Sequence, residues 1–137
     1  MPQVQGILET AIYVSDLERS VDWFGRVMGL SEILHDKRMC AFNVGQRNVL
    51  LLFQIGGSIH GEEMPGGFIP PHDAAGRIHF AFAIDATELD AWKTHLQQNG
   101  VEIESEVKAE RGGTSLYFRD PDGHLVELAT RGLWPHY

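Results

Sequence analysis

The stretch that decides the fold is YFRDPDGHLVEL, residues 117–128. Within it, Pro121 fixes a negative φ and Gly123 accepts a positive φ, a combination that favours a tight hairpin between two strands. The second strand is apolar over residues 125–129 except for Glu127. An ionised carboxylate in a half-buried strand is costly unless it is paired or bound to a metal. We therefore expect an electropositive partner beside Glu127.

Composition limits the classes of function. The 137 residues are 43% apolar, which is enough for the core of one domain and makes a second independent core improbable. Eleven Lys and Arg against nineteen Asp and Glu give a net charge of −8, so nucleic acid and anionic membrane surfaces are poor partners. No apolar stretch approaches the ~20 residues that span a bilayer. Cys40 is the single cysteine, and residues 1–6 lack signal-peptide features, so we expect a cytoplasmic protein without disulfides.

Hydrophobic periodicity indicates the order β-α-β-β-β twice, with an internal repeat of roughly 70 residues. The expected strands and helices are 7–14 (strand), 15–29 (helix), 33–35, 39–44 and 49–55 (strands), then 78–84 (strand), 85–100 (helix), 101–107, 115–119 and 125–130 (strands). This predicts an α+β domain over 1–137 with two modules, about 7–55 and about 77–131. Each curved mixed sheet would form a half-barrel, and together they would enclose a cavity.

Two segments fall outside the repeat. Residues 56–76 are rich in glycine and proline and too long for a simple connection, which predicts a linker, a lid or both. His60 and His72 in this loop could close over a site, although we expect solvated side chains. Trp134, near the C-terminus, is expected to pack against a neighbouring surface, because a tail tryptophan is usually buried.

Strand alternation assigns the faces. His79 alternates with Phe80 and Phe82, so it points away from the helix-covered face and toward the cavity. The same argument places Glu9 and Glu127 inward. On the strand that precedes the hairpin, it also places an inward row at the cavity or its rim: Ser115, Tyr117 and Arg119.

Two carboxylates and an imidazole suit Mn²⁺, Fe²⁺, Co²⁺, Ni²⁺ or Zn²⁺, and three protein ligands leave positions open for a substrate. Glu9, His79 and Glu127 are therefore the predicted metal ligands. Two simpler readings remain open. His79 could be a hydrogen-bonded core residue, and the carboxylates could instead pair with arginines, of which the candidates are Arg77, Arg119 and Arg131.

The segments LETAIYVSDLERS, residues 8–20, and YFRDPDGHLVEL, residues 117–128, resemble the vicinal oxygen chelate superfamily, and the likeness extends over nearly the whole chain. This superfamily includes glyoxalase I, fosfomycin-resistance proteins, extradiol dioxygenases and bleomycin-binding proteins. The resemblance implies metal ligands at Glu9, His79 and Glu127, with glutamate at position 9 where histidine or glutamine is usual. It also implies a homodimer that acts on a small molecule.

The resemblance does not identify the reaction, because one scaffold supports many. Leu51 occupies the position of a carboxylate ligand in glyoxalase I. Extradiol dioxygenases bind their iron with two histidines and one glutamate, and Glu9 does not match this ligand set. Ser115-x-Tyr117-Phe118 is similar to fosfomycin-resistance proteins, in which the serine and tyrosine contact the substrate.

The expected function is a divalent-metal-dependent enzyme of the glyoxalase and fosfomycin-resistance type, which binds a substrate through vicinal oxygens. Glu127 or Tyr117 would move the proton. Ser115, Arg111 and Arg119 would contact the substrate, although Arg111 equally suits a plain hairpin turn. The alternatives are a metal-free protein that sequesters a drug or metabolite, as bleomycin-resistance proteins do, and an oxidoreductase like the extradiol dioxygenases.

Overall fold

The computed structural model describes residues 1–137. The elements run in the order β1 (Glu9–Val14), α1 (Leu17–Met28), β2 (Ser31–His35), β3 (Met39–Val44), β4 (Asn48–Gln54), β5 (Glu62–Met64), β6 (Gly67–Ile69), β7 (His79–Ala83), η1 (Ala86–Glu88), α2 (Leu89–Gln98), β8 (Ser105–Lys108), β9 (Thr114–Arg119) and β10 (Leu125–Ala129). The chain divides into two compact units, residues 1–75 and residues 76–137.

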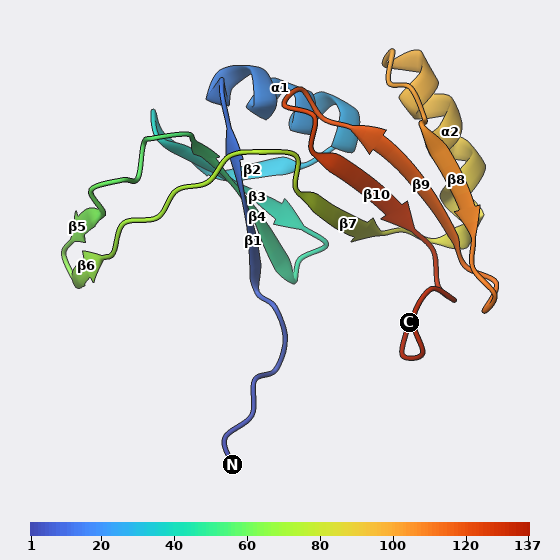
Figure 1. The fold of residues 1–137 in the computed structure, drawn as a ribbon, viewed down its shortest axis with the longest axis horizontal. Coiled ribbons are helices and arrows are strands. Elements are labelled where there is room, and N and C mark those ends of the chain that lie inside the picture. The colour runs from blue at the N-terminus through green and yellow to red at the C-terminus, as the bar shows by residue number, and fades with distance from the viewer. The chain divides into compact units, whose positions relative to one another are not determined.

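Each unit contains one four-stranded mixed sheet (Figure 1). The strand orders are β1-β4-β3-β2 in the first unit and β7-β10-β9-β8 in the second, so the two sheets have the same topology. In both, the first strand lies parallel to the last, and the other pairs are antiparallel. Glu9 and His79 are the first residues of the equivalent strands β1 and β7. The repeat and the α+β class predicted from the sequence are therefore confirmed.

Local sequence explains the first helix. Asp16 caps α1 by accepting a hydrogen bond from the Arg19 backbone N–H, and such a cap stabilises a helix by about 1 kcal/mol. Gly29 ends the helix in the left-handed conformation, with φ of 67°. The inner side of α1 is buried and contacts β3 and β4. The buried residues of α1 cover one face of the first sheet, so the other face can line a site.

The turn between β9 and β10 is built around Asp120. Its carboxylate accepts hydrogen bonds from the backbone N–H groups of Asp122 at 3.2 Å and His124 at 2.7 Å, and its second oxygen lies 2.6 Å from His124 Nδ1. Asp120 and His124 are buried, and Gly123 has φ of 81°. This network fixes the register of the hairpin, because only one pairing of β9 and β10 is compatible with it. In that register Glu127 lies opposite Tyr117.

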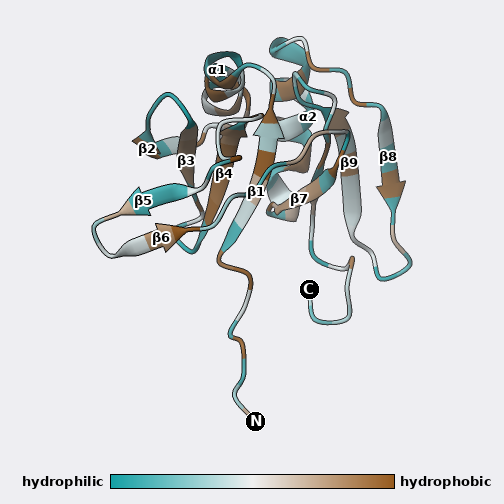
Figure 2. Cartoon of the chain, turned by 60° about the vertical axis from the view of Figure 1, so that its left-hand side comes forward, coloured by the Kyte–Doolittle hydropathy of each residue, from teal (hydrophilic) through white to brown (hydrophobic).

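Alternation gives the two faces of each sheet different characters. In the second unit, the face opposite Glu127 holds four side chains without any exposed surface, namely Leu116, Phe118, Val126 and Leu128. In the first unit, Figure 2 shows alternating hydropathy along β1, whereas β4 is mostly hydrophobic. Neither helix has the length and hydropathy needed to cross a bilayer.

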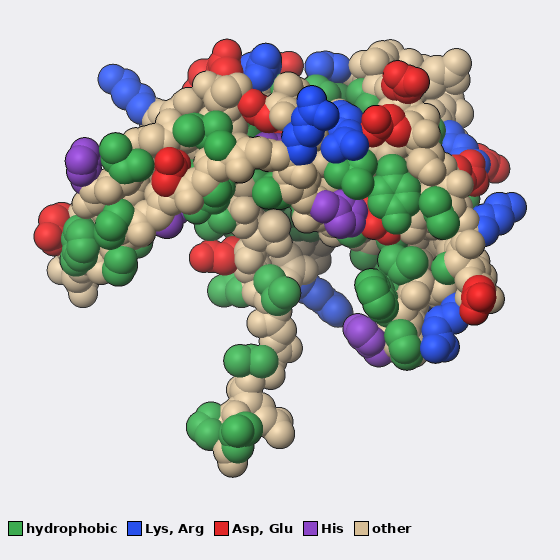
Figure 3. Space-filling view, viewed as in Figure 1, with side chains coloured by type: hydrophobic (Ala, Val, Ile, Leu, Met, Phe, Trp, Pro, Cys, Tyr) green, Lys and Arg blue, Asp and Glu red, His purple; other side chains and the backbone are tan.

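Two expectations about the elements were wrong. The loop over residues 56–76 contains a hairpin of β5 and β6, whose strands have only three residues each and no alternating pattern that could reveal them. Apolar side chains gather on this hairpin (Figure 3), and Phe68 is 54% exposed. The strand expected over residues 101–107 begins only at Ser105, because Val101 still donates its N–H to the Leu96 carbonyl at the end of α2.

Candidate metal centre

His79 and Glu127 meet on one face of the second sheet. His79 Nε2 lies 3.2 Å from Glu127 Oε1, and His79 Nδ1 lies 2.9 Å from the Leu125 carbonyl oxygen. Because a carbonyl only accepts, Nδ1 carries the proton and donates it to Leu125, which leaves the lone pair of Nε2 directed toward Glu127. The neighbour of Glu127 Oε1 is therefore an imidazole lone pair and none of the three candidate arginines, so the electropositive partner expected for Glu127 would be a cation shared by both side chains.

Glu127 is held from its other side as well. The Ser115 hydroxyl donates a hydrogen bond of 2.7 Å to Glu127 Oε2, and both side chains are buried, with exposures of 2% and 4%. Each carboxylate oxygen therefore has one partner. Tyr117 faces Glu127 from β9, and its ring centroid lies 6.1 Å from that of His79. The cluster of Ser115, Tyr117, His79 and Glu127 thus comes from three adjacent strands of one sheet.

The donor set of this cluster fits a divalent transition metal. A neutral imidazole nitrogen and a carboxylate oxygen converge, and each is oriented by a partner outside the pair: the Leu125 carbonyl for His79 and the Ser115 hydroxyl for Glu127. Metal-binding histidines commonly donate their second N–H to a carbonyl or carboxylate, which fixes the tautomer that binds the ion. Side chain exposure of 48% for His79 leaves the pair open to a ligand.

Glu9, the third predicted ligand, belongs to the first unit and lines a cavity of about 760 Å³ there. It is exposed and lies at the edge of a face shared with Ala11 and Tyr13 of β1 and with Leu51 and Phe53 of β4. The walls are largely apolar. The cavity is therefore suited to an organic molecule, and Glu9 supplies a carboxylate at its border.

We expected His72 to be a solvated loop residue, but its side chain lines this cavity. Its Nδ1 lies 2.7 Å from the Tyr13 hydroxyl, and its ring meets the Phe53 ring edge-on at 4.6 Å between centroids. Burial, with the negative charge of Asp73, raises the pKa of Tyr13. His60, by contrast, is exposed as expected. Alternation along β1 puts Tyr13 on the face of Glu9, but no local signal connects Tyr13 to His72, 59 positions later.

Arg38 ties the β5–β6 hairpin to the first sheet. Its guanidinium donates to the Ser58 hydroxyl at 2.6 Å, forms an ion pair with Glu62 and lies 5.5 Å from the centre of the Phe53 ring. Ser58 and Glu62 belong to the loop over residues 56–76, whereas Phe53 belongs to β4. The loop therefore covers one side of the cavity. Whether the loop is a linker, a lid or both stays a prediction. No local pattern pointed to Arg38, because its partners are 20 and 24 residues away along the chain.

Of the two arginines predicted to contact the substrate, Arg119 has partners within the second unit and Arg111 lies in a turn. Arg119 Nε donates to Glu104 at 2.7 Å, and its Nη1 donates to the Gly123 carbonyl at 3.0 Å, so Arg119 braces the hairpin turn. Arg111 is exposed in the turn between β8 and β9, where Gly112 N–H donates to the Ala109 carbonyl. The hairpin turn weighed for Arg111 is therefore present.

Comparison with known proteins agrees with this architecture. Residues 6–128 match the family model described as the Glyoxalase/Bleomycin resistance protein/Dioxygenase superfamily. A crystal structure of lactoylglutathione lyase from Agrobacterium tumefaciens superimposes with a TM-score of 0.86 and 34% identity, covering 97% of this chain and 98% of that one. The fosfomycin-resistance protein FosX from Mesorhizobium loti gives a TM-score of 0.64 at 25% identity, covering 93% of each chain.

Curated relatives point to the same class of enzyme. The metallothiol transferase FosB of Shouchella clausii is 30% identical over 129 residues, which are 93% of this chain and 81% of that protein. The glutathione transferase FosA of Serratia marcescens is 30% identical over 125 residues, or 91% of this chain and 80% of that protein. An enzyme of the vicinal oxygen chelate type is thereby confirmed, and a divalent metal is supported. The chain belongs to the Glyoxalase/Bleomycin resistance protein/Dioxygenase superfamily.

Proposed function

We propose that this protein is a divalent-metal-dependent enzyme that acts on a small molecule bound through adjacent oxygens. The observation that carries the proposal is the pair of His79 Nε2 and Glu127 Oε1, 3.2 Å apart, with each partner oriented by a further hydrogen bond. Relatives described as a metallothiol transferase and a glutathione transferase support group transfer, and the structural neighbour described as a lactoylglutathione lyase supports a lyase.

Glu9, His79 and Glu127 would hold the ion, which is Mn²⁺, Fe²⁺, Co²⁺, Ni²⁺ or Zn²⁺ by donor type. When bound, the ion supplies Lewis-acid polarisation of a substrate oxygen. Glu9 comes from the first unit, so the third ligand is contributed either by the same chain or by a second copy in a homodimer. A glutamate there adds negative charge and favours a harder cation than a histidine would.

The chain's own residues have separate tasks in this proposal. Ser115 acts as a positioning residue, because its hydroxyl proton is already donated to Glu127. Tyr117 lies across from Glu127 on the same face, and we assign its hydroxyl to move a proton at the substrate oxygen where charge develops. Arg111 is exposed and can meet an anionic substrate, whereas the ion pair with Glu104 commits Arg119 to the turn.

Elemental analysis of protein purified without chelators tests the metal site. We expect near-stoichiometric transition metal in the wild type and its loss in His79→Ala and Glu127→Ala. Glu106→Ala is the matched control. Glu106 is a surface carboxylate on β8, the strand next to β9, and it is paired with Lys93 of α2. A wild type without metal, whose melting temperature does not rise with any of the five ions, would refute the proposal and leave the metal-free sequestering protein as the alternative.

Mixing two inactive variants tests how Glu9 reaches the site. If each site takes Glu9 from a second copy, Glu9→Ala and His79→Ala chains that exchange at random should recover about a quarter of the wild-type sites, because half of the dimers are mixed and each has one intact site. If each site lies within one chain, mixing recovers none. Metal-supplemented screening against hemithioacetal, epoxide, catechol and acyl-CoA substrates then identifies the reaction.

A further inference from the structure

A second pocket, of about 310 Å³, lies at the edge strand β7 of the second sheet and includes alanines on the face that carries Glu127. Its base is formed by Ala81, Ala83 and Ala129. Ala81 is the register partner of Glu127 on the adjacent strand, and Ala83 pairs with Ala129 one step further along. Neighbouring strands are about 4.8 Å apart and alternate residues about 6.6 Å apart, so the pocket begins directly beside the Glu127 carboxylate.

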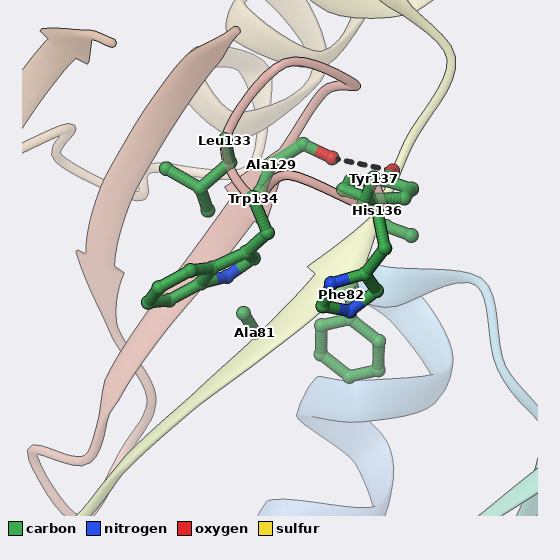
Figure 4. A pocket seen from close by; sticks show the side chains of 8 residues that line it. Ala81, Phe82, Ala129, Leu133, Trp134, His136 and Tyr137 are labelled. Atoms are coloured by element: carbon green, nitrogen blue, oxygen red, sulfur yellow. Dashed lines mark hydrogen bonds between the residues drawn. The ribbon is translucent and has the colours of Figure 1, made fainter. Parts of the chain in front are cut away.

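The C-terminal residues form the opposite side of this pocket. Trp134 and His136 project over the alanines, while the Tyr137 hydroxyl donates to the Ala129 carbonyl at 3.1 Å (Figure 4). The tail is closed on itself, because Gly132 N–H donates to the Tyr137 carbonyl at 2.7 Å and Tyr137 N–H donates to the Trp134 carbonyl at 3.0 Å. The pocket is therefore formed before any ligand arrives.

Close packing at Gly132 fixes the direction of the tail. Gly132 has φ of 99°, and a Cβ there would lie 2.6 Å from Gly113 N, so a side chain cannot be accommodated. Gly113 N–H in turn donates to the Gly132 carbonyl. As a result the Trp134 side chain does not pack against a surface, contrary to our expectation: it is 61% exposed at the edge of the pocket. An exposed indole at the edge of a preformed apolar pocket is a typical stacking surface for a ligand.

The lining determines the chemistry of the ligand. No Asp, Glu, Lys or Arg lines the pocket, and His136 is its single histidine. A phosphonate or carboxylate would find no cation there. An apolar cavity of about 150 Å³ accepts benzene, so a volume of about 310 Å³ is sufficient for a substituted ring. Trp134 and Tyr137 offer aromatic faces to such a ring.

We propose that this pocket is the subsite for an aryl group on the substrate, with the chelating oxygens of the same molecule at His79 and Glu127. The inference rests on the proposed function for the position of the chelating end. It also deepens that function, because the substrate becomes an aromatic compound with adjacent oxygens rather than a small aliphatic epoxide. The aryl group is joined closely to the chelating oxygens, since the register places Ala81 directly opposite Glu127.

Two hydroxamates that differ only in the aryl group test the subsite. Benzohydroxamate and acetohydroxamate chelate a metal through the same two adjacent oxygens, so the ratio of their Kd values isolates the ring. By calorimetry on Mn²⁺-loaded protein, we expect benzohydroxamate to bind about tenfold tighter. Trp134→Ala should reduce the ratio to about twofold and leave acetohydroxamate affinity and metal content unchanged. Trp134→Phe, which keeps an aromatic ring, should retain most of the ratio.

Equal affinity for the two hydroxamates in the wild type, or an unchanged ratio in Trp134→Ala, overturns the subsite. A separate readout distinguishes this from failure of the metal site. In metal-free protein, millimolar benzohydroxamate should shift the NMR signals of the Trp134 indole N–H and the Ala81 and Ala129 amides. If added metal does not tighten the binding of either hydroxamate but these shifts occur, the proposed function fails and the aryl pocket stands. If the signals do not move, the pocket proposal fails.

Discussion

Replacing Ser115 by alanine removes one hydrogen bond to the Glu127 carboxylate without touching either side chain of the His79–Glu127 pair. The bond is 2.7 Å long and joins two buried groups. A hydrogen bond to a charged group contributes about 1.5–3 kcal/mol, which corresponds to roughly 10- to 150-fold in an equilibrium constant. Losses of metal affinity on removing such orienting partners are typically 10- to 100-fold. We expect the Ser115→Ala variant to bind Mn²⁺ within this range, 10- to 100-fold more weakly than the wild type.

The assay is calorimetric titration of chelator-treated protein with Mn²⁺, combined with urea unfolding of the metal-free form. In the absence of metal, the unpartnered Glu127 oxygen should lower the free energy of unfolding by about 1–3 kcal/mol. Thr114→Ala is the control, because Thr114 precedes Ser115 on β9 and its side chain points to the other face. If Ser115→Ala binds Mn²⁺ within twofold of the wild type while Glu127→Ala does not bind, the orienting role of Ser115 is refuted.

Three further predictions concern the first unit. Burial lowers the pKa of His35, but the Glu18 and Glu32 carboxylates raise it by more, so the net shift is upward. The stability that the charged imidazole contributes is therefore complete below about pH 6.5, and it is lost as pH rises through the pKa of the folded state. Glu18→Gln should lower the His35 titration midpoint measured by NMR, and an unchanged midpoint would contradict the assignment. Burial, with the nearby carboxylates, raises the pKa of the Cys40 thiol from 9.0 to about 12, so the unfolding free energy should fall as pH rises above about 9, and a thiol reagent at pH 8 should react only after denaturation. Arg38→Ala should accelerate hydrogen exchange in residues 58–69 and leave β1 and β4 unchanged; equal rates throughout would show that Arg38 does not hold the loop.

The repeat was predictable because its signals are local. Alternation of apolar residues along a strand and helical spacing over three turns depend on neighbours in the sequence, and so do the cap at Asp16 and the stop at Gly29. The β5–β6 hairpin gave no such signal, because alternation is readable only over about four or more residues and these strands have three each. The late start of β8 was missed for a similar reason: the backbone of Val101 still completes the end of α2.

The candidate site divides in the same way. Alternation placed His79 and Glu127 on inward positions, and the pair is confirmed as a contact. The sequence could not indicate that Ser115 is bonded to Glu127, because that depends on the register of β9 against β10. It also could not indicate that His72 contacts Tyr13, or that Arg119 is held by Glu104, since these partners lie far apart in the chain.

By itself, the sequence determined the duplicated βαβββ pattern, the hairpin turn that precedes Glu127 and the need for an electropositive partner there. These follow from backbone preferences and from the cost of burying a charge, which act over a few residues. The tertiary structure alone decided the tautomer of His79, the partner of each Glu127 oxygen and the pocket closed by the C-terminal tail. Those features arise where strands and tail from distant parts of the chain come within a few ångströms, and local patterns contain no information about that proximity.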